Sequence, residues 1–295
     1  MREFEGVFIP VPTPYKGEVV ATDRLKDNLA QWNQTGLAGY VMLGSTGEFP
    51  LLSDAERDAV LVAAREGITR DKTMIAGTGS NSTLLTIRQT KRAAEIGADL
   101  AIVITPHYFT KGFSRPAAQI HHYLAVAEAS PIPIVLYNFP LNTGINLEPD
   151  TVARIAEHPN VAGIKDSSGN IPQAAQIIHL TPKSFHVHVG AAAALLPSLT
   201  IGASGGVLAL AVIAAREFVE VYTLAKQGRW GEAKEIAARM MRADRGVSGR
   251  YGIGGLKAAL DLQGLYGGPC RAPLETPDGD GIDDIKESLA SAGLL

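Results

Sequence analysis

The sequence has few of the features that mark secreted, membrane or nucleic-acid-binding proteins. Its single cysteine, Cys270, excludes an internal disulfide framework and a cysteine-rich metal site, as is typical of a reducing compartment. The 27 Lys and Arg residues and 30 Asp and Glu residues leave a net charge of -3, which indicates no surface for nucleic acid. Residues 1–15 contain proline and charge where a signal peptide needs an apolar core, and no later run reaches the length of a membrane span. We therefore expect a cytoplasmic protein without a membrane or nucleic-acid partner.

One repeating pattern dominates the rest of the sequence. About eight short apolar, β-branched runs are each followed by a stretch with helical periodicity: GVFIPV, GYVMLG, TMIAGTG, DLAIVIT, IPIVLYNF, VAGIKD, FHVHVG and ASGGVLAL. This pattern predicts a parallel (β/α)8 TIM barrel over residues 1–225. Residues 226–295 contain further helical stretches and are predicted to form a C-terminal helical extension. A doubly wound open sheet is the alternative fold.

Two helix starts are marked by residues that cap free backbone N–H groups. Ser53 and Glu56 have the spacing of a capping box, and Ser80-Asn81-Ser82 precedes the periodic stretch TLLTIRQTKRAAEIG. We expect a helix to begin after each of them.

A charged residue interrupts the apolar run VAGIKD. Lys165 falls at the expected C-terminal end of the sixth strand, where barrel enzymes carry their reactive groups. Because burial disfavours the charged form of a lysine, its neutral amine would be a usable nucleophile and could form a Schiff base with a ketone or aldehyde. The structural alternative is an ion pair with a carboxylate such as Glu48 or Asp166.

Two more segments supply polar groups at the same end of the expected barrel. In LGSTGEF, two glycines bracket Ser45 and Thr46, an arrangement that can direct backbone N–H groups and two hydroxyls at an anion. The segment lacks the lysine and spacing of a P-loop, and a tight turn that needs glycine explains it about equally well. Tyr137 ends the run IPIVLY; it could exchange a proton with an oxygen near Lys165, or be a core tyrosine with a satisfied hydroxyl.

The remaining polar residues predict no further site. His186 and His188 share one face of a strand, which is the spacing of a metal pair, but no acidic cluster completes it, so we expect no metal. Tyr108 lies on a loop, where an aromatic ring packs more often than it reacts. Cys270 lacks the setting of a nucleophile and is expected to pack.

The motifs GSTGE, YNFP and GIKDSSG, in this order and at these separations, resemble the pyruvate-dependent class I aldolases. This family includes dihydrodipicolinate synthase, N-acetylneuraminate lyase and 4-hydroxy-2-oxoglutarate aldolase. The resemblance covers nearly the whole chain, from GVFIPVPTPY to the C-terminal helices. It implies a lyase without a cofactor that acts on pyruvate and an aldehyde and assembles as a tetramer, a dimer of dimers.

The resemblance also implies roles for single residues. Lys165 matches the Schiff-base lysine and Tyr137 the general acid/base. Ser45 and Thr46 match the pair that holds the pyruvate carboxylate. Tyr108 matches a tyrosine that reaches into the neighbouring active site of a dimer and joins a relay with Ser45 and Tyr137. Backbone that lines the substrate pocket is matched by Gly190 and by the segment GGVLA at 205–209, which includes Val207.

One position bears most on the aldehyde partner. Dihydrodipicolinate synthases carry an arginine that holds the semialdehyde carboxylate where this sequence has Asn142, and an asparagine cannot replace a bidentate guanidinium. The segments EFPLLSDAER, NTG, KDSSG and YGGPCRAPL instead resemble 4-hydroxy-2-oxoglutarate aldolase, whose animal form has asparagine in place of Thr46.

We therefore expect cleavage of 4-hydroxy-2-oxoglutarate to pyruvate and glyoxylate. The protonated Schiff base on Lys165 would act as an electron sink while the C3–C4 bond breaks, and Tyr137 would take the proton of the C4 hydroxyl. The alternatives are a 4-hydroxy-tetrahydrodipicolinate synthase and an aldolase or dehydratase for 2-keto-3-deoxy sugar acids. An alternative of another class is a catalytically silent barrel that only binds a 2-oxo acid.

Overall fold

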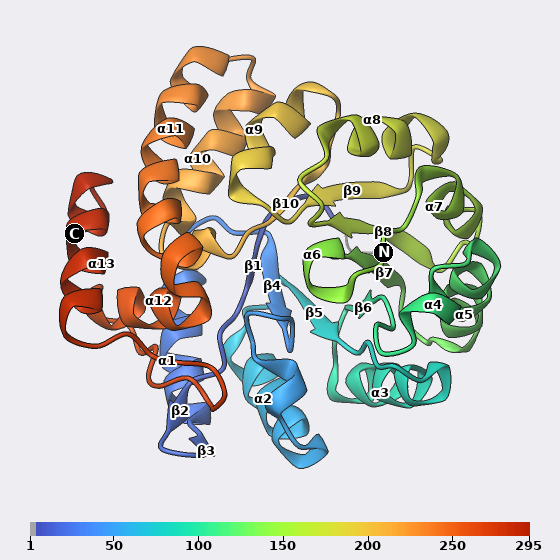
Figure 1. Ribbon diagram of the computed structural model, residues 1–295, viewed down its shortest axis with the longest axis horizontal. Helices are drawn as coiled ribbons and strands as arrows, with labels where there is room; N and C mark the ends of the chain where they lie inside the picture. The colour runs from blue at the N-terminus through green and yellow to red at the C-terminus, as the bar shows by residue number, and fades with distance from the viewer. Residues whose placement is uncertain (1–3) are drawn as a thin grey trace. The chain divides into compact units, whose positions relative to one another are not determined.

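The computed structural model describes residues 4–295 and confirms the (β/α)8 barrel (Figure 1). Its eight strands close in the order β1-β10-β9-β8-β7-β6-β5-β4, so the doubly wound open sheet is wrong. The strands are β1 (Gly6–Pro10), β4 (Gly39–Met42), β5 (Thr73–Gly77), β6 (Leu100–Ile104), β7 (Ile134–Asn138), β8 (Val161–Asp166), β9 (His186–Val189) and β10 (Gly205–Val207). A separate antiparallel ribbon pairs β2 (Tyr15–Lys16) with β3 (Val19–Val20).

Helices follow the barrel strands along the chain. They are α1 (Thr22–Trp32), α2 (Asp54–Gly67), α3 (Thr83–Ile96), α4 (Thr110–Phe113), α5 (Pro116–Ala129), α6 (Pro140–Thr143), α7 (Pro149–Ala156), α8 (Ile171–Leu180), α9 (Ala192–Thr200), α10 (Ala215–Lys226), α11 (Trp230–Gly246), α12 (Ser248–Leu262) and α13 (Gly279–Ser291), with 3-10 turns η1 (Phe49–Leu51) and η2 (Leu210–Val212). Both expected helix starts are confirmed: Ser53 and Glu56 form the capping box of α2, and Ser82 caps α3.

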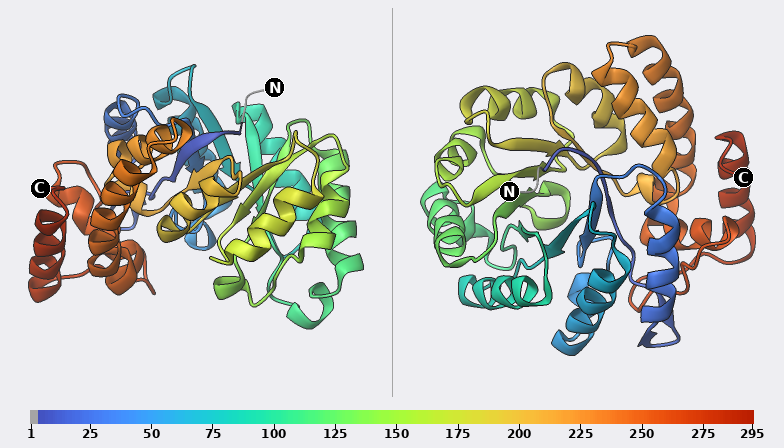
Figure 2. Two further views of the ribbon diagram at one scale, coloured as in Figure 1. Left: turned by 90° about the horizontal axis from the view of Figure 1, so that it is seen from above. Right: turned by 180° about the vertical axis from the view of Figure 1, so that it is seen from behind.

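The chain divides into two compact units. One contains the described residues up to Gly6 and residues Thr73–Val207, and Figure 1 shows its helices α3, α5, α7 and α8 outside strands β6 to β9. The other contains Val7–Lys72 and Leu208–Leu295. Within it, α11 packs against α10, α12 and α13, which are the orange to red helices of Figure 2. The division predicted at residue 225 stays a prediction.

One hydrophobic cluster fixes which way the strand residues of the first unit point. Leu136 of β7 and Ile164 of β8 are buried in this cluster together with side chains of α5 and α7, including Tyr123, Val126, Val152 and Ile155. Because successive strand residues point to opposite faces, the next residues, Tyr137 and Lys165, point away from these helices and into the barrel.

A one-residue irregularity in β8 sets this orientation. Ile134 pairs with Val161, whereas Val135 pairs with Gly163, so Ala162 is an extra residue opposite β7. Such a bulge shifts the alternation of the residues that follow it. Without it, Lys165 would face the covering helices.

The same stretch of β8 tolerates only glycine at position 163. A Cβ on Gly163 would lie 2.2 Å from the carbonyl oxygen of His186, on the neighbouring strand β9. The missing side chain therefore allows the two strands to pair directly after the bulge.

We expect Gly163→Ala to lower the free energy of unfolding by about 1–3 kcal/mol, because the added methyl group forces the backbone of β8 or β9 to move. Chemical denaturation of the variant and the wild type measures this difference. Gly231→Ala is the matched control, since a Cβ at that position of α11 meets nothing within 4 Å. The control should gain up to about 1 kcal/mol from helix propensity. A Gly163→Ala protein as stable as the wild type would contradict this packing.

Candidate active site

Lys165 and Tyr137 lie side by side at the C-terminal ends of two neighbouring strands. They are register partners on β8 and β7, and Lys165 Nζ lies 4.2 Å from the centroid of the Tyr137 ring. Each side chain is buried, with a residue exposure of 5%. This is the end at which barrel enzymes carry their chemistry, and an amine beside a phenol can form a Schiff base and exchange a proton.

The structure does not support the ion-pair alternative for Lys165. The Glu48 carboxylate is bound to a different lysine, Lys257. The Asp166 carboxylate accepts hydrogen bonds from Asn138, Ser168 and Gln173. Throughout residues 4–295, Lys165 forms no ion pair. An ion pair within residues 4–295 therefore does not explain why Lys165 is buried.

A buried polar network holds the strand ends that carry the pair. Asn138 and Asp166 directly follow Tyr137 and Lys165, and the Asn138 amide donates to Asp166 Oδ1 at 3.0 Å. Asp166 also accepts from the N–H and the hydroxyl of Ser168, at 2.9 Å each, and from Gln173 Nε2 at 3.1 Å. Both carboxylate oxygens are thus occupied, and the ends of β7 and β8 are fixed to each other and to α8.

Gly190 allows the chain after β9 to pass close to Lys165. Its N–H donates to the carbonyl oxygen of Asp166 at 2.8 Å. A Cβ on Gly190 would lie 1.8 Å from Ser167 Oγ and 3.1 Å from Lys165 Cε, so a side chain would displace both. Val207, the last residue of β10, is fully buried.

Ser45 and Thr46 belong to the other compact unit, in a turn of unusual backbone geometry after β4. The turn begins and ends with non-glycine residues in the left-handed region, Leu43 at φ 56° and Glu48 at φ 57°. Such conformations are costly and occur preferentially at ligand and active sites. The simple glycine turn considered from the sequence does not require them.

The hydrogen bonds inside this turn do not involve Thr46. The N–H groups of Gly47 and Glu48 donate to the carbonyl oxygens of Gly44 and Ser45, each at 3.0 Å. Thr46 is 8% exposed and makes no hydrogen bond within residues 4–295. Its N–H and hydroxyl therefore stay available to an anion.

Tyr108 and Asn142 are both exposed. The Tyr108 residue is 76% exposed and its ring packs edge-to-face against Phe109, with 5.0 Å between centroids. Its N–H donates to Asn81 Oδ1 at 3.0 Å, which fixes the loop. Asn142 lies in the short helix α6, and its N–H donates to the carbonyl oxygen of Phe139 at 3.0 Å. Neither side chain hydrogen-bonds Lys165.

Comparison with known proteins places the chain in a family. A profile of the dihydrodipicolinate synthetase family matches residues 3–292. The chain belongs to this family. Two relatives, from Methanospirillum hungatei and Methanothrix thermoacetophila, are named 4-hydroxy-tetrahydrodipicolinate synthase. They are 35% and 38% identical, over 97% and 92% of this chain and 99% and 91% of their own. The chloride-inhibited dihydrodipicolinate synthase of Acinetobacter baumannii, solved with pyruvate, has a TM-score of 0.91 at 30% identity, over 99% of each chain.

Family membership confirms the resemblance to class I aldolases, and the chain is a lyase of the pyruvate-dependent kind. The relatives are named as synthases, so the particular likeness to 4-hydroxy-2-oxoglutarate aldolase is unconfirmed. The tetramer and the cytoplasmic location stay predictions. No helix among residues 4–295 is both long and apolar enough to cross a membrane.

His186 and His188 both pack against an aromatic side chain. The His188 ring stacks on Phe4, with 3.8 Å between centroids, and His186 packs edge-on against the same ring. Burial lowers the pKa of His188 well below its usual value. In the part of the chain that the structure describes, no three His, Cys, Asp or Glu side chains come together as metal ligands.

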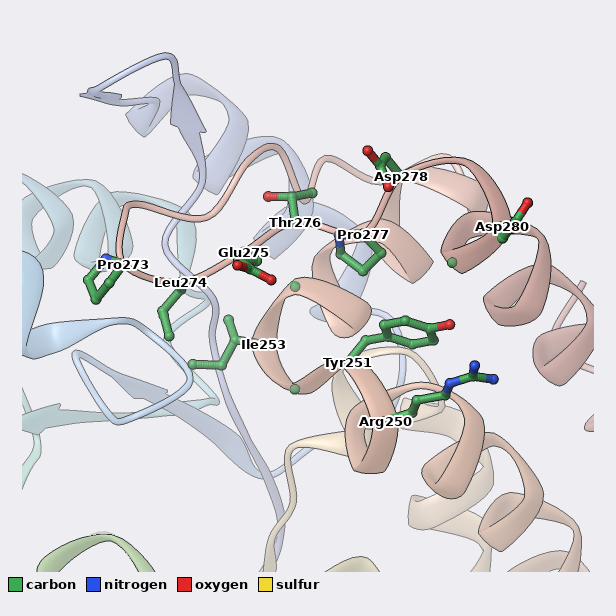
Figure 3. Close-up of a pocket in the computed structure, with 13 residues that line it drawn as sticks. Arg250, Tyr251, Ile253, Pro273, Leu274, Glu275, Thr276, Pro277, Asp278 and Asp280 are labelled. Atoms are coloured by element: carbon green, nitrogen blue, oxygen red, sulfur yellow. The ribbon is translucent and has the colours of Figure 1, made fainter.

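A pocket of about 780 Å³ is formed by the first turns of α12 and the segment 273–281, whose lining residues are drawn in Figure 3. Its Tyr251 hydroxyl donates to Asp284 at 2.6 Å, and Arg250 forms an ion pair with the same carboxylate at 2.7 Å. The lining includes no lysine and none of the side chains that the sequence singled out. This cavity is therefore unsuited to Schiff-base chemistry.

Sequence reasoning missed two polar residues behind Lys165 and one buried lysine. Asn146 and Gln173 complete the network of Asn138 and Asp166, and nothing in their spacing distinguishes them from loop residues. Lys257 could have been found, because it interrupts the apolar stretch GGLKAAL as Lys165 interrupts VAGIKD.

We expect Asp166→Asn to destabilise the protein by about 2–3 kcal/mol, because the new amide group brings donors to a position already surrounded by donors. Urea denaturation measures the loss. Asp283→Asn, at an exposed position of α13, is the control and should stay within about 0.5 kcal/mol of the wild type. Equal stability of the two variants would mean that the network does not fix the strand ends.

Proposed function

We propose that the chain is a lyase that binds pyruvate as a Schiff base on Lys165. The observation that carries this proposal is the buried pair of Lys165 and Tyr137, in which the lysine has no counterion within residues 4–295. No carboxylate therefore holds this lysine away from a substrate carbonyl. The amine attacks C2 of pyruvate, and loss of water gives the protonated imine.

The imine then permits carbon–carbon chemistry at C3. Loss of a C3 proton gives an enamine, which adds to an aldehyde carbon, and in the reverse direction the C3–C4 bond breaks to give the same enamine. Tyr137 exchanges the proton of the resulting hydroxyl. We assign Ser45 and Thr46 to the pyruvate carboxylate, and Gly190 and Val207 to the wall of the pocket.

Exposure of Tyr108 supports a role in a second copy of the chain. Its ring and that of Phe109, which is 74% exposed, form an aromatic pair that a partner subunit would cover. In a dimer of dimers, Tyr108 would complete the proton relay of the neighbouring Tyr137 through Ser45.

The aldehyde partner has two main candidates. The named relatives favour aspartate semialdehyde and the formation of 4-hydroxy-tetrahydrodipicolinate, which was the alternative from the sequence, so this reaction is tested first. Asn142 counts against efficient use of aspartate semialdehyde, because an asparagine cannot replace the bidentate guanidinium that holds the semialdehyde carboxylate. Cleavage of 4-hydroxy-2-oxoglutarate to pyruvate and glyoxylate is the second candidate. Rates with both substrates and with 2-keto-3-deoxy sugar acids separate these readings.

Sodium borohydride with pyruvate should leave a reduced pyruvyl adduct on Lys165, located by intact mass and peptide mapping. Lys165→Ala should abolish this adduct and lower turnover by roughly 10³-fold or more, with an unchanged circular dichroism spectrum. Lys183→Ala, which removes an exposed lysine, is the control and should behave like the wild type. A folded wild-type protein without any adduct would instead favour the silent barrel.

Asn142→Arg should raise kcat/KM for aspartate semialdehyde by about tenfold, because a bidentate guanidinium–carboxylate contact contributes about 1.5–3 kcal/mol. Steady-state kinetics at saturating pyruvate measure the change. Asn142→Gln keeps the amide and should leave the value within about twofold. If arginine and glutamine have the same effect, residue 142 does not contact the aldehyde substrate.

A further inference from the structure

Lys257 is a second buried lysine, and the proposed chemistry does not use it. It lies in α12 with 0% exposure. Its Nζ forms an ion pair with Glu48, donates to the carbonyl oxygen of Pro269 at 2.8 Å, and lies 4.5 Å from the centroid of the Tyr15 ring. The ammonium group is thus bound on several sides by oxygen and by an aromatic face.

Glu48 receives a second partner from the segment that follows α12. The backbone N–H of Arg271 donates to Glu48 Oε2 at 2.9 Å. The Arg271 guanidinium lies 4.6 Å from the centroid of the Tyr15 ring and binds Glu56 Oε1 at 2.7 Å. We call Tyr15, Glu48, Lys257 and Arg271 the Glu48 cluster.

Stability alone is a poor reason for this cluster. Removing two charges from water is costly, and well-packed apolar side chains in place of a buried ion pair are often as stabilising or more so. Burial also lowers the pKa of Lys257, against the attraction of Glu48. We therefore looked to the position of Glu48 in the fold for a further role of the Glu48 cluster.

That role follows from where Glu48 lies. Glu48 is the last residue of the turn that contains Ser45 and Thr46, and it has the left-handed φ of 57°. A strained residue persists only where its surroundings fix it, and here the buried ion pair and the Arg271 N–H hold its side chain.

We propose that Lys257 and Arg271 are positioning residues for pyruvate binding: they anchor Glu48 so that the strained turn holds Ser45 and Thr46 in the orientation that binds the pyruvate carboxylate. This inference rests on the proposed Schiff-base function. It assigns to the C-terminal part of the chain a contribution to affinity for the 2-oxo acid, distinct from any contribution to the aldehyde site.

The test compares three variants with the wild type. Lys257→Met leaves Glu48 buried without its cation, so that protein is destabilised. Glu48→Gln/Lys257→Met removes both charges and keeps an acceptor for the Arg271 N–H. Arg250→Met is the control, because Arg250 also lies in α12 (Figure 3) but contacts Tyr251 and the partly exposed Asp284, which are outside the Glu48 cluster.

Two readouts are followed: the pyruvate concentration that gives half-maximal borohydride trapping on Lys165, and the KM values for pyruvate and for the aldehyde. In the double variant, the pyruvate concentration for half-maximal trapping and the KM for pyruvate should both rise about tenfold. The melting temperature should stay within a few degrees of the wild type. The KM for the aldehyde and the adduct at saturating pyruvate should be retained. Arg250→Met should change none of these values.

An unchanged half-trapping concentration in the folded double variant would overturn the positioning role and leave the Schiff base standing. An equal rise in both KM values would also overturn it, because the variant would then disturb the barrel as a whole. No adduct in the wild type would overturn the Schiff-base function and, with it, this inference.

Discussion

The bulge at Ala162 is the constraint on which the rest of the site depends. Before it, β8 pairs with β7 in the register that buries Val161 against the helices; after it, the register brings Lys165 beside Tyr137. A strand without the extra residue would bury the same apolar side chains on the wrong faces. The register of β8 thus determines whether Lys165 points into the barrel beside Tyr137 or toward the helix layer.

Several separate contacts keep that register in place. Gly163 lets β8 approach β9, and the Asn138–Asp166 bond joins the ends of β7 and β8. Gly190 closes the other side by binding the Asp166 carbonyl. Each contact lies within two residues of the bulge, the lysine or their register partners. A site of this kind is positioned by paired strands, which are less mobile than loops.

Much of this arrangement could be predicted from the sequence, and the part that could not has a physical reason. The alternating runs predicted the barrel, Ser53 and Glu56 predicted a helix start, and the strand-end rule selected Lys165 and Tyr137. Inward and outward residues could not be told apart, because strands buried on both faces show no polar alternation. The bulge at Ala162 could therefore not be predicted from the sequence. Partners distant in sequence were equally hidden: Glu48 was considered as a counterion for Lys165, and it binds Lys257 instead.

The two buried lysines show how one residue type serves two purposes. Lys257 is surrounded by a carboxylate, a carbonyl and an aromatic face, so its side chain is held in place. Lys165 lies against the face of Tyr137, while the carboxylates of Glu48 and Asp166 are held by other donors. A bound counterion would oppose the neutral amine that attacks a carbonyl. The distribution of carboxylates therefore distinguishes Lys257, which is held in an ion pair, from Lys165, to which the Schiff base is assigned in the proposed reaction.

In the proposed reaction, pyruvate and the aldehyde are bound by different kinds of residues. The pyruvate half rests on buried groups whose register, bulge and hydrogen bonds constrain one another, so it should persist among relatives that share about a third of their residues. The aldehyde half rests on residue 142, which is exposed in a four-residue helix and touches little of that framework. Substitution there costs the fold little, and loops are where binding preferences diverge. Identity spread over the whole chain thus bears mainly on the pyruvate half of the proposal, whereas the proposed choice of acceptor depends on the side chain at one exposed position, residue 142.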